Sequence, residues 1–185
     1  RRCLIVALLA ALSAAAGPPS AGRRYREAHE RAIIDEFAAL LSIPNVARDL
    51  PDMRRNAAHI RRMLEKRGIR ARLLEVEGGP PAIHGEIRTP GARRTLLFYA
   101  HYDGQPVEPR QWTGHHPFEP ILRNRPLEAG GVPIPLPAPG RRFDPEWRLY
   151  ARAAGDDKAP IIAWLTALDA LRDARIRLRS NIVFF

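Results

Sequence analysis

Two pairs of polar side chains have the residue types and the spacing that metal coordination needs. The first pair is His101 and Asp103, which follow an apolar run, and the second is the adjacent carboxylates Asp156 and Asp157. Side chains alternate between two faces along an extended segment, so His101 and Asp103 are predicted to point to the same side. A metal-bound imidazole commonly donates its second N–H to a carboxylate, which Asp103 could supply. A hydrogen-bonded His and Asp pair without metal is the alternative.

The second pair stands directly before a predicted helix. Asp156 and Asp157 are followed by Lys158, and Pro160 suits the first turn of a helix. Carboxylates at a helix N-terminus are favoured by the positive end of the helix dipole. Helix capping explains one Asp at this place, but it does not explain two followed by Lys. A capping role and a ligand role are therefore both kept for this pair.

Two further groups of residues give weaker signals for a site. His115 and His116 are adjacent in a predicted loop, where histidines either bind metal or are simply solvated. His84 and Glu86 share one face of a predicted strand, but no supporting motif follows them. We therefore expect these residues to be structural or surface residues.

The elements that must position these residues alternate between helices and strands. Apolar residues at helical spacing predict helices at 24–41, 51–68 and 159–171. Short apolar runs bounded by Gly or Pro predict strands at 71–76, 82–87, 95–103 and 181–185. The continuous apolar character of the last two predicts strands covered on both faces. This alternation indicates an α/β fold, while residues 123–147, rich in Pro and Gly, are expected to form an irregular surface loop.

The net charge of +10 raises the question of a nucleic-acid partner. The charge is scattered and is carried almost entirely by arginine, with lysine only at Lys66 and Lys158. No recognised nucleic-acid-binding motif accompanies it, so we expect no nucleic-acid partner.

The first residues have the layout of a secretory signal. Arg1 and Arg2 precede an apolar run at 4–16, which ends in three small residues suited to cleavage. The run is shorter than the ~20 residues of a membrane span, so no stable membrane anchor is expected. A buried N-terminal helix is the alternative. We predict a signal peptide and linker at 1–22, a domain at 23–185, and a secreted or periplasmic protein.

In combination the motifs resemble the zinc metallopeptidase family that includes carnosine dipeptidase, glutamate carboxypeptidase, acetylornithine deacetylase and succinyl-diaminopimelate desuccinylase. The resemblance runs from about residue 25 to the end and is carried by YAHYDGQPV at 99–107, Trp112, PFEP at 117–120 and LYARAAGDDK at 149–158. Several ordered motifs are far more specific than any one of them. The resemblance implies the N-terminal part of a phosphorylase/hydrolase-like catalytic domain, with a mostly parallel sheet flanked by helices.

The resemblance also implies roles for particular residues. His101 would be a ligand of one zinc ion, Asp156 would bridge two zinc ions, and Asp103 would be a catalytic residue that orients His101. The peptide between Asp156 and Asp157 is expected to be cis. Two metal ions would polarise an amide carbonyl and hold a hydroxide nucleophile.

The chain departs from the family pattern at three glycines and in the Pro-rich loop at 123–147, which is longer than the family usually places there. The family usually has Gly where this chain has Ala151, Ala153 and Ala159, so backbone freedom is lost at three points. The family also places a glutamate pair, with the general base as its first member, after the strand represented here by residues 181–185. Those glutamates, further ligands and a lid domain lie outside this sequence, so the chain as given is expected to be inactive.

The leading hypothesis is zinc-dependent hydrolysis of amide bonds in peptides or N-acyl amino acids, by an exopeptidase or dipeptidase. A homodimer formed through the lid domain is compatible with the resemblance. One alternative is a truncated, non-catalytic product that binds a partner through its basic surface. Another is a nuclease or phosphatase that uses the same ligands on phosphate. A Glu-Glu pair beyond Phe185 would favour the peptidase.

Overall fold

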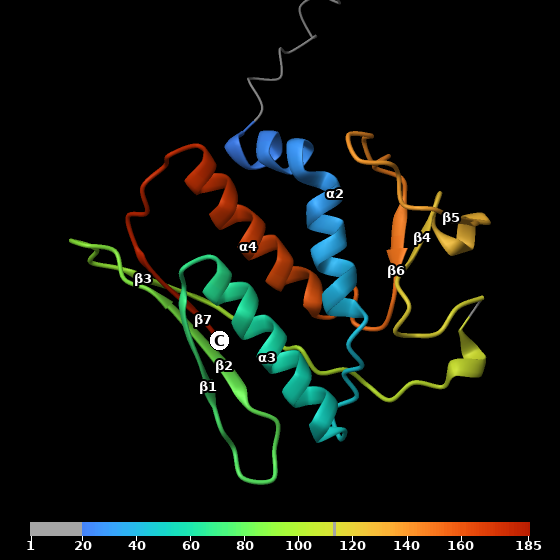
Figure 1. Ribbon diagram of the computed structural model, residues 1–185, viewed down its shortest axis with the longest axis horizontal. Helices are drawn as coiled ribbons and strands as arrows, with labels where there is room; N and C mark the ends of the chain where they lie inside the picture. Colours follow the sequence, from blue (N-terminus) through green and yellow to red (C-terminus); the bar gives the residue numbers. More distant parts are fainter. Residues whose placement is uncertain (1–19, 113) are drawn as a thin grey trace, which may run out of the picture.

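Three amphipathic segments form the long helices of the computed structural model, which describes residues 20–112 and 114–185 (Figure 1). The helices are α2 (Ala21–Leu41), α3 (Leu50–Lys66) and α4 (Lys158–Asp173), so the predicted helices are confirmed to within a few residues at each end. Side chains cap two of them, because Ser20 accepts a hydrogen bond from the Arg23 N–H and Asp49 accepts one from the Asp52 N–H. The predicted signal at residues 1–16 lies outside the described residues.

The main sheet is mixed in direction. Its strands are β1 (Arg70–Leu74), β2 (Ala82–Ile87), β7 (Asn181–Phe184) and β3 (Thr95–Phe98), in the spatial order β1-β2-β7-β3. The α/β class is confirmed. The expectation of a mostly parallel sheet is not met in the described residues, because β1–β2 and β2–β7 pair antiparallel and only β3–β7 is parallel. The short connection between β1 and β2 permits a hairpin, whereas β3 reaches β7 through the crossover that contains α4.

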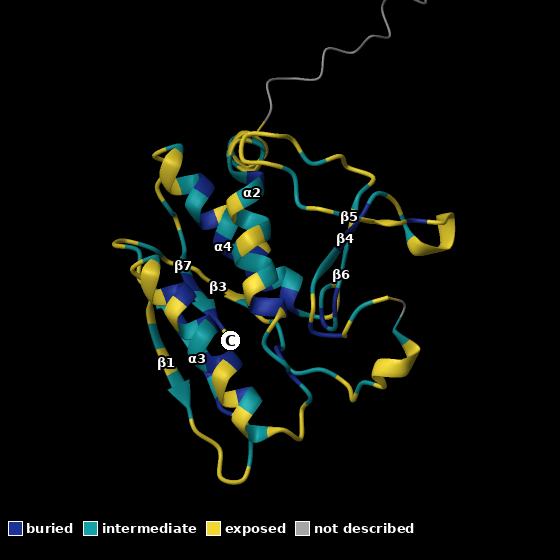
Figure 2. Ribbon diagram, turned by 45° about the vertical axis from the view of Figure 1, so that its right-hand side comes forward, coloured by how far each residue is buried: buried dark blue, intermediate teal, exposed yellow. Residues whose placement is uncertain are grey.

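The core lies between one face of this sheet and the helices. α3 packs on β1 and β2, Trp164 of α4 contacts Phe98 and Phe184, and α2 packs mainly on α4. Buried residues of the helices therefore face the sheet or one another (Figure 2). The fully or almost fully buried apolar residues include Leu40, Leu41, Met53, Ala57, Ile69 and Leu165.

The apolar run that precedes His101 forms an edge strand. β3 ends at Phe98 rather than at Asp103, and Leu96 and Leu97 are 49% and 65% exposed. The prediction of a strand covered on both faces is therefore wrong for β3 in the described residues. The reason is its position, since β3 has β7 as its neighbour on one side and lies at the end of the strand order.

Residues 123–147 are largely irregular, as expected, except for two short elements within them, and the strands on either side of the range pair with each other. A second, antiparallel sheet combines β5 (Pro133–Ile134), β4 (Ile121–Arg123) and β6 (Arg148–Tyr150), accompanied by the short 3-10 helices η1 (Pro109–Gln111) and η2 (Leu127–Ala129). Strands of two or three residues are too short to show an alternation of apolar and polar residues. The many Pro and Gly residues therefore led to the prediction of a loop. The backbone N–H of Arg152 donates to the Pro117 carbonyl at 2.7 Å and joins the two ends of this small sheet.

The described helices also bear on membrane insertion. None of the helices within residues 20–112 and 114–185 has the length and apolar character needed to cross a bilayer.

Candidate metal centre

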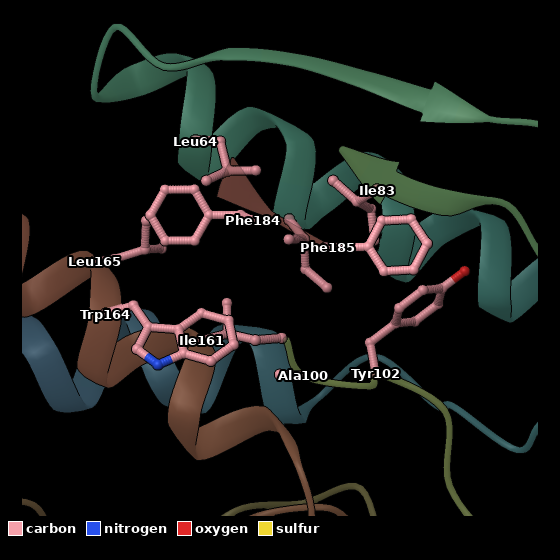
Figure 3. A pocket seen from close by; sticks show the side chains of 10 residues that line it. Leu64, Ile83, Ala100, Tyr102, Ile161, Trp164, Leu165, Phe184 and Phe185 are labelled. Carbon is pink, nitrogen blue, oxygen red and sulfur yellow. The ribbon is translucent and has the colours of Figure 1, made fainter. Parts of the chain in front are cut away.

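His101 is positioned by the segment that leaves β3. The neighbouring side chains Ala100 and Tyr102 point inward, where they line an apolar cavity of about 30 Å³ with residues of α4 and β7 (Figure 3). The Tyr102 hydroxyl donates to the Pro81 carbonyl, which fixes the inward side. His101 is 38% exposed and Asp103 is 46% exposed, so the two residues share the outer side, as the period-two alternation predicts.

The imidazole of His101 lies between two carboxylates. Its Nδ1 is 3.1 Å from Oδ1 of Asp103, and its Nε2 is 2.9 Å from Oδ1 of Asp156. The predicted convergence of His101 and Asp156 is therefore observed, although 55 residues separate them. Asp156 is 91% exposed, so the point where the two side chains meet is open to solvent.

The charges around His101 change its pKa. Burial alone would lower the pKa, but the Asp103 backbone carbonyl and the charges of Asp103 and Asp156 outweigh burial and raise it above the ordinary value of 6.5. The doubly protonated ring is thereby favoured, with one N–H available to each carboxylate. A cation placed between Nε2 and Asp156 would replace the proton on Nε2, while Asp103 would keep the proton on Nδ1.

The turn that carries Asp156 has an unusual backbone. The peptide between Asp156 and Asp157 is cis, as the family resemblance implies, and Ala153 has a φ of 63° at one of the positions where the family usually has Gly. Asp157 occupies the N-cap position of α4, but its side chain makes no capping hydrogen bond. Helix capping therefore does not account for the acidic pair in this structure, and Asp156 instead contacts His101.

Lys158 was part of the motif in the sequence, but its role could not be assigned there. Its side chain is fully buried, and its Nζ donates to the carbonyl oxygens of Leu40 and Ile43 at 2.9 and 3.0 Å. Burial lowers the pKa of Lys158 to about 7. The sequence did hold one sign that Lys158 is special. Of the 30 lysine and arginine residues, only Lys66 and Lys158 are lysine.

Asn45 is a residue that the sequence did not single out. It is fully buried in the connection between α2 and α3, and its Nδ2 donates to the Tyr102 carbonyl at 2.8 Å. No pattern marks it in the sequence, since a single Asn after Pro44 is ordinary turn composition.

The remaining candidates have other surroundings. Glu86 forms ion pairs with Arg70 and Arg88, on the face of β2 that turns away from the core, and His84 shares that face. The ring of His115 packs edge-on against Trp112, and the Phe118 N–H donates to Nδ1 of His116. These contacts agree with the expectation of structural or surface roles.

Curated relatives match a little more than half of this chain. The chain is 25% identical over 104 residues to the Cys-Gly metallodipeptidase dug1 of Schizosaccharomyces pombe, which covers 56% of this chain and 17% of the relative. It is 30% identical over 105 residues to the human Beta-Ala-His dipeptidase, which covers 57% of this chain and 16% of the relative. No family model matches the chain.

Solved structures extend the likeness over most of the chain. The M20 family metallo-carboxypeptidase Sso-CP2 of Sulfolobus solfataricus aligns with a TM-score of 0.62 and 27% identity, over 82% of this chain and 29% of that one. Human carnosine dipeptidase 1 aligns with a TM-score of 0.67 and 22% identity, over 90% of this chain and 34% of that one. The homologues and structural neighbours of this chain are M20 family metallopeptidases. The chain corresponds to about a sixth of the curated relatives and a third of the human structure.

The M20 likeness implies a metal cofactor, and the donor set can be tested against that implication. Imidazole nitrogen and carboxylate oxygen are both zinc ligands. A histidine that binds a metal through one ring nitrogen usually donates the N–H of the other to a carboxylate or carbonyl oxygen. His101, Asp103 and Asp156 match this chemistry. Within residues 20–112 and 114–185 no group of three or more ligand side chains is arranged to hold a metal ion. The three side chains are therefore chemically suited to metal binding, and in the described residues they bring fewer than three ligands to one place.

A hollow of about 210 Å³ lies beside His101. His101 and Asp103 line it together with apolar side chains, among them Met53, Tyr99 and Phe185. Such a combination of apolar walls and a few polar groups is usual for sites that bind small molecules. The polar pair at its edge belongs to the candidate metal centre.

Proposed function

We propose that this chain is part of an M20-type metallopeptidase that hydrolyses the amide bond of a dipeptide or an N-acyl amino acid. The observation that carries the proposal is the contact of 2.9 Å between His101 Nε2 and Asp156 Oδ1, made by two motifs that are 55 residues apart. Dipeptidase and carboxypeptidase relatives support the reaction class.

In this proposal each residue of the centre has a separate task. Asp103 holds the proton on Nδ1 of His101, which keeps the lone pair of Nε2 directed toward the metal. His101 and Asp156 would be the residues of this chain that hold the zinc. When bound, the metal would supply polarisation of the scissile carbonyl and activation of water near neutral pH. The domain at 23–185 would then supply part of one active site.

We further propose that the general base lies outside these 185 residues. The carboxylates in contact with His101 are occupied in orienting the ring or in holding metal, and Glu86 is held in ion pairs with Arg70 and Arg88. A missing general base alone typically lowers the rate by about 10² to 10⁴-fold. Residues 1–185 are therefore expected to hydrolyse peptides far more slowly than a longer chain that includes the base.

The test compares residues 1–185 with a chain extended through the reading frame. Both are assayed with zinc on Cys-Gly, β-Ala-His and a set of N-acyl amino acids, and the extended chain is also prepared as His101→Ala and as His84→Ala. We expect activity in the extended chain and in His84→Ala, and a large loss in His101→Ala. Equal hydrolysis by the short and extended chains would contradict the placement of the base. Hydrolysis of phosphate esters but not of amides would contradict the peptidase assignment.

A further inference from the structure

We propose that Asn45 and Lys158 are positioning residues that hold His101 and Asp156 in register by anchoring both ligand segments to one turn, residues 40–46. This turn includes the C-terminal end of α2 and the first part of its connection to α3. The inference rests on the proposed function, because it concerns the same centre.

The Asp156 segment is fixed to the turn by Lys158. The lysine follows the acidic pair directly, has no exposed surface, and donates to the carbonyls of Leu40 and Ile43. The last carbonyls of a helix lack partners within the helix, so a buried N–H donor such as the Lys158 side chain is well placed there. The backbone N–H of Lys158 also donates to the Ala153 carbonyl at 3.1 Å, and this bond closes the turn that contains Asp156.

The His101 segment is fixed to the same turn by Asn45. The Asn45 side chain donates to the Tyr102 carbonyl, which lies between His101 and Asp103 in the chain. The backbone makes two more bonds, since the Gly104 N–H donates to the Asn45 carbonyl at 2.7 Å and the Ala47 N–H donates to the Gly104 carbonyl at 3.1 Å. A Cβ atom on Gly104 would lie 3.0 Å from Nδ2 of Asn45, so the two segments are closely packed.

These contacts fix the His101 segment and the Asp156 segment to the same turn at 40–46, although the three are far apart in the sequence. Lys158 is 118 residues from Leu40, and Asn45 is 57 residues from Tyr102. In both cases a buried side chain donates to backbone carbonyls, and these bonds determine where the neighbouring ligand segment lies. Asn45 and Lys158 do not themselves occupy the point between His101 and Asp156. Their role is to act through the residues that do.

The experiment uses the full 185-residue chain as wild type, Asn45→Ala and Lys158→Met. Arg67→Met is the matched control, because Arg67 also joins the helices through hydrogen bonds, to Glu36 and Asp169, but has no bond to the turn at 40–46. Two readouts are taken at one pH. The first is the ¹⁵N NMR spectrum of the His101 ring without metal, and the second is the affinity for Co²⁺ alone, followed by visible absorption.

We expect Asn45→Ala and Lys158→Met to change the His101 ring signals and to weaken Co²⁺ binding about 10-fold or more, the scale found for groups that orient metal ligands. We expect Arg67→Met to lower thermal stability while it leaves both readouts close to wild type. Wild-type ring signals in folded Asn45→Ala and Lys158→Met would overturn the inference, and so would equal changes in Arg67→Met. Altered ring signals in a chain whose wild type binds no Co²⁺ would support the positioning role while contradicting the proposed metal site.

Discussion

His59 is a half-buried residue that contributes to the response of this protein to acid. It lies on α3 and is half-buried, and its pKa is lowered from 6.5 first by burial and then by the charge of Arg62. A lowered pKa means that the unfolded chain takes up the proton more readily than the folded one. The stability associated with neutral His59 is therefore complete above pH 6.5 and declines as the pH falls below that value.

The prediction is that acidification from pH 7.5 to pH 5.5 lowers the unfolding temperature more in wild type than in His59→Gln. Thermal melts of both proteins at the two pH values measure this difference. Glu36 does not confuse the comparison, because its carboxyl has an ordinary pKa of 4.5 and its folded pKa is lower still. Although burial alone would raise the pKa of Glu36, its hydrogen bond and charge interaction with Arg67 outweigh burial. An equal shift in both proteins would contradict the assignment to His59.

At the residue scale, the sequence identified the polar side chains that meet but not the ones that hold them. His101, Asp103 and Asp156 belong to motifs whose order and spacing can be read along the chain. Asn45 and Lys158 matter through contacts with backbone carbonyls far away in the sequence. Such contacts depend on how α2 packs against α4, and no local pattern reports that packing.

At the scale of elements, α4 depends on apolar packing more than on its ends. Leu165 is 1% exposed and lines the small cavity beside Trp164 and Phe184 (Figure 3). Replacing a buried Leu with Ala removes apolar contacts and leaves a void that the surroundings fill only in part. The existing cavity of about 30 Å³ would be enlarged by this change.

We predict that Leu165→Ala lowers the free energy of unfolding by about 2 to 5 kcal/mol, the range typical of buried Leu. Leu127→Ala is the control, since Leu127 is 37% exposed in η2 and should change stability far less. Urea denaturation followed by circular dichroism measures both changes. A similar loss in the two variants would show that α4 does not carry the core in the way described.

The elements were predictable where one pattern dominated. Helical spacing located α2, α3 and α4, and Gly and Pro bounded the main strands. Strand direction was not predictable in the same way. β2 and β7 pair although about half of the chain separates them, and no local pattern in either strand indicates that the pairing is antiparallel. The small sheet escaped notice because β4, β5 and β6 have only two or three residues each.

At the scale of the whole molecule, the main sheet presents an apolar edge. Leu96, Leu97 and Tyr99 are 49%, 65% and 63% exposed in or directly after β3, and Phe185 is 46% exposed beside them. An exposed apolar edge strand offers unpaired backbone groups and an apolar surface to another chain. The 185-residue chain is therefore expected to self-associate as its concentration rises.

The prediction is that Leu97→Lys reduces this self-association without unfolding the protein, because a charge on an edge strand opposes pairing. Sedimentation velocity over a range of concentrations compares wild type, Leu97→Lys and Val76→Lys. Val76 is a suitable control because it is 53% exposed but lies after β1 at the other end of the strand order. Equal association of wild type and Leu97→Lys would place the contact elsewhere.

The hydrogen bond between Arg152 and Pro117 affects how freely the segment between these two residues can change in length among related proteins. Because it brings the two ends of the small sheet together, the intervening residues leave the domain and return at one place. Closing a flexible loop costs only about 0.6 kcal/mol more for each doubling of its length. Insertions and deletions between these ends can thus accumulate at little entropic cost, apart from contacts such as that of the Phe143 N–H with Glu30. His101 and Asp156 lie on either side of the closed base, so relatives can vary in this excursion while the two ligand segments keep their separation.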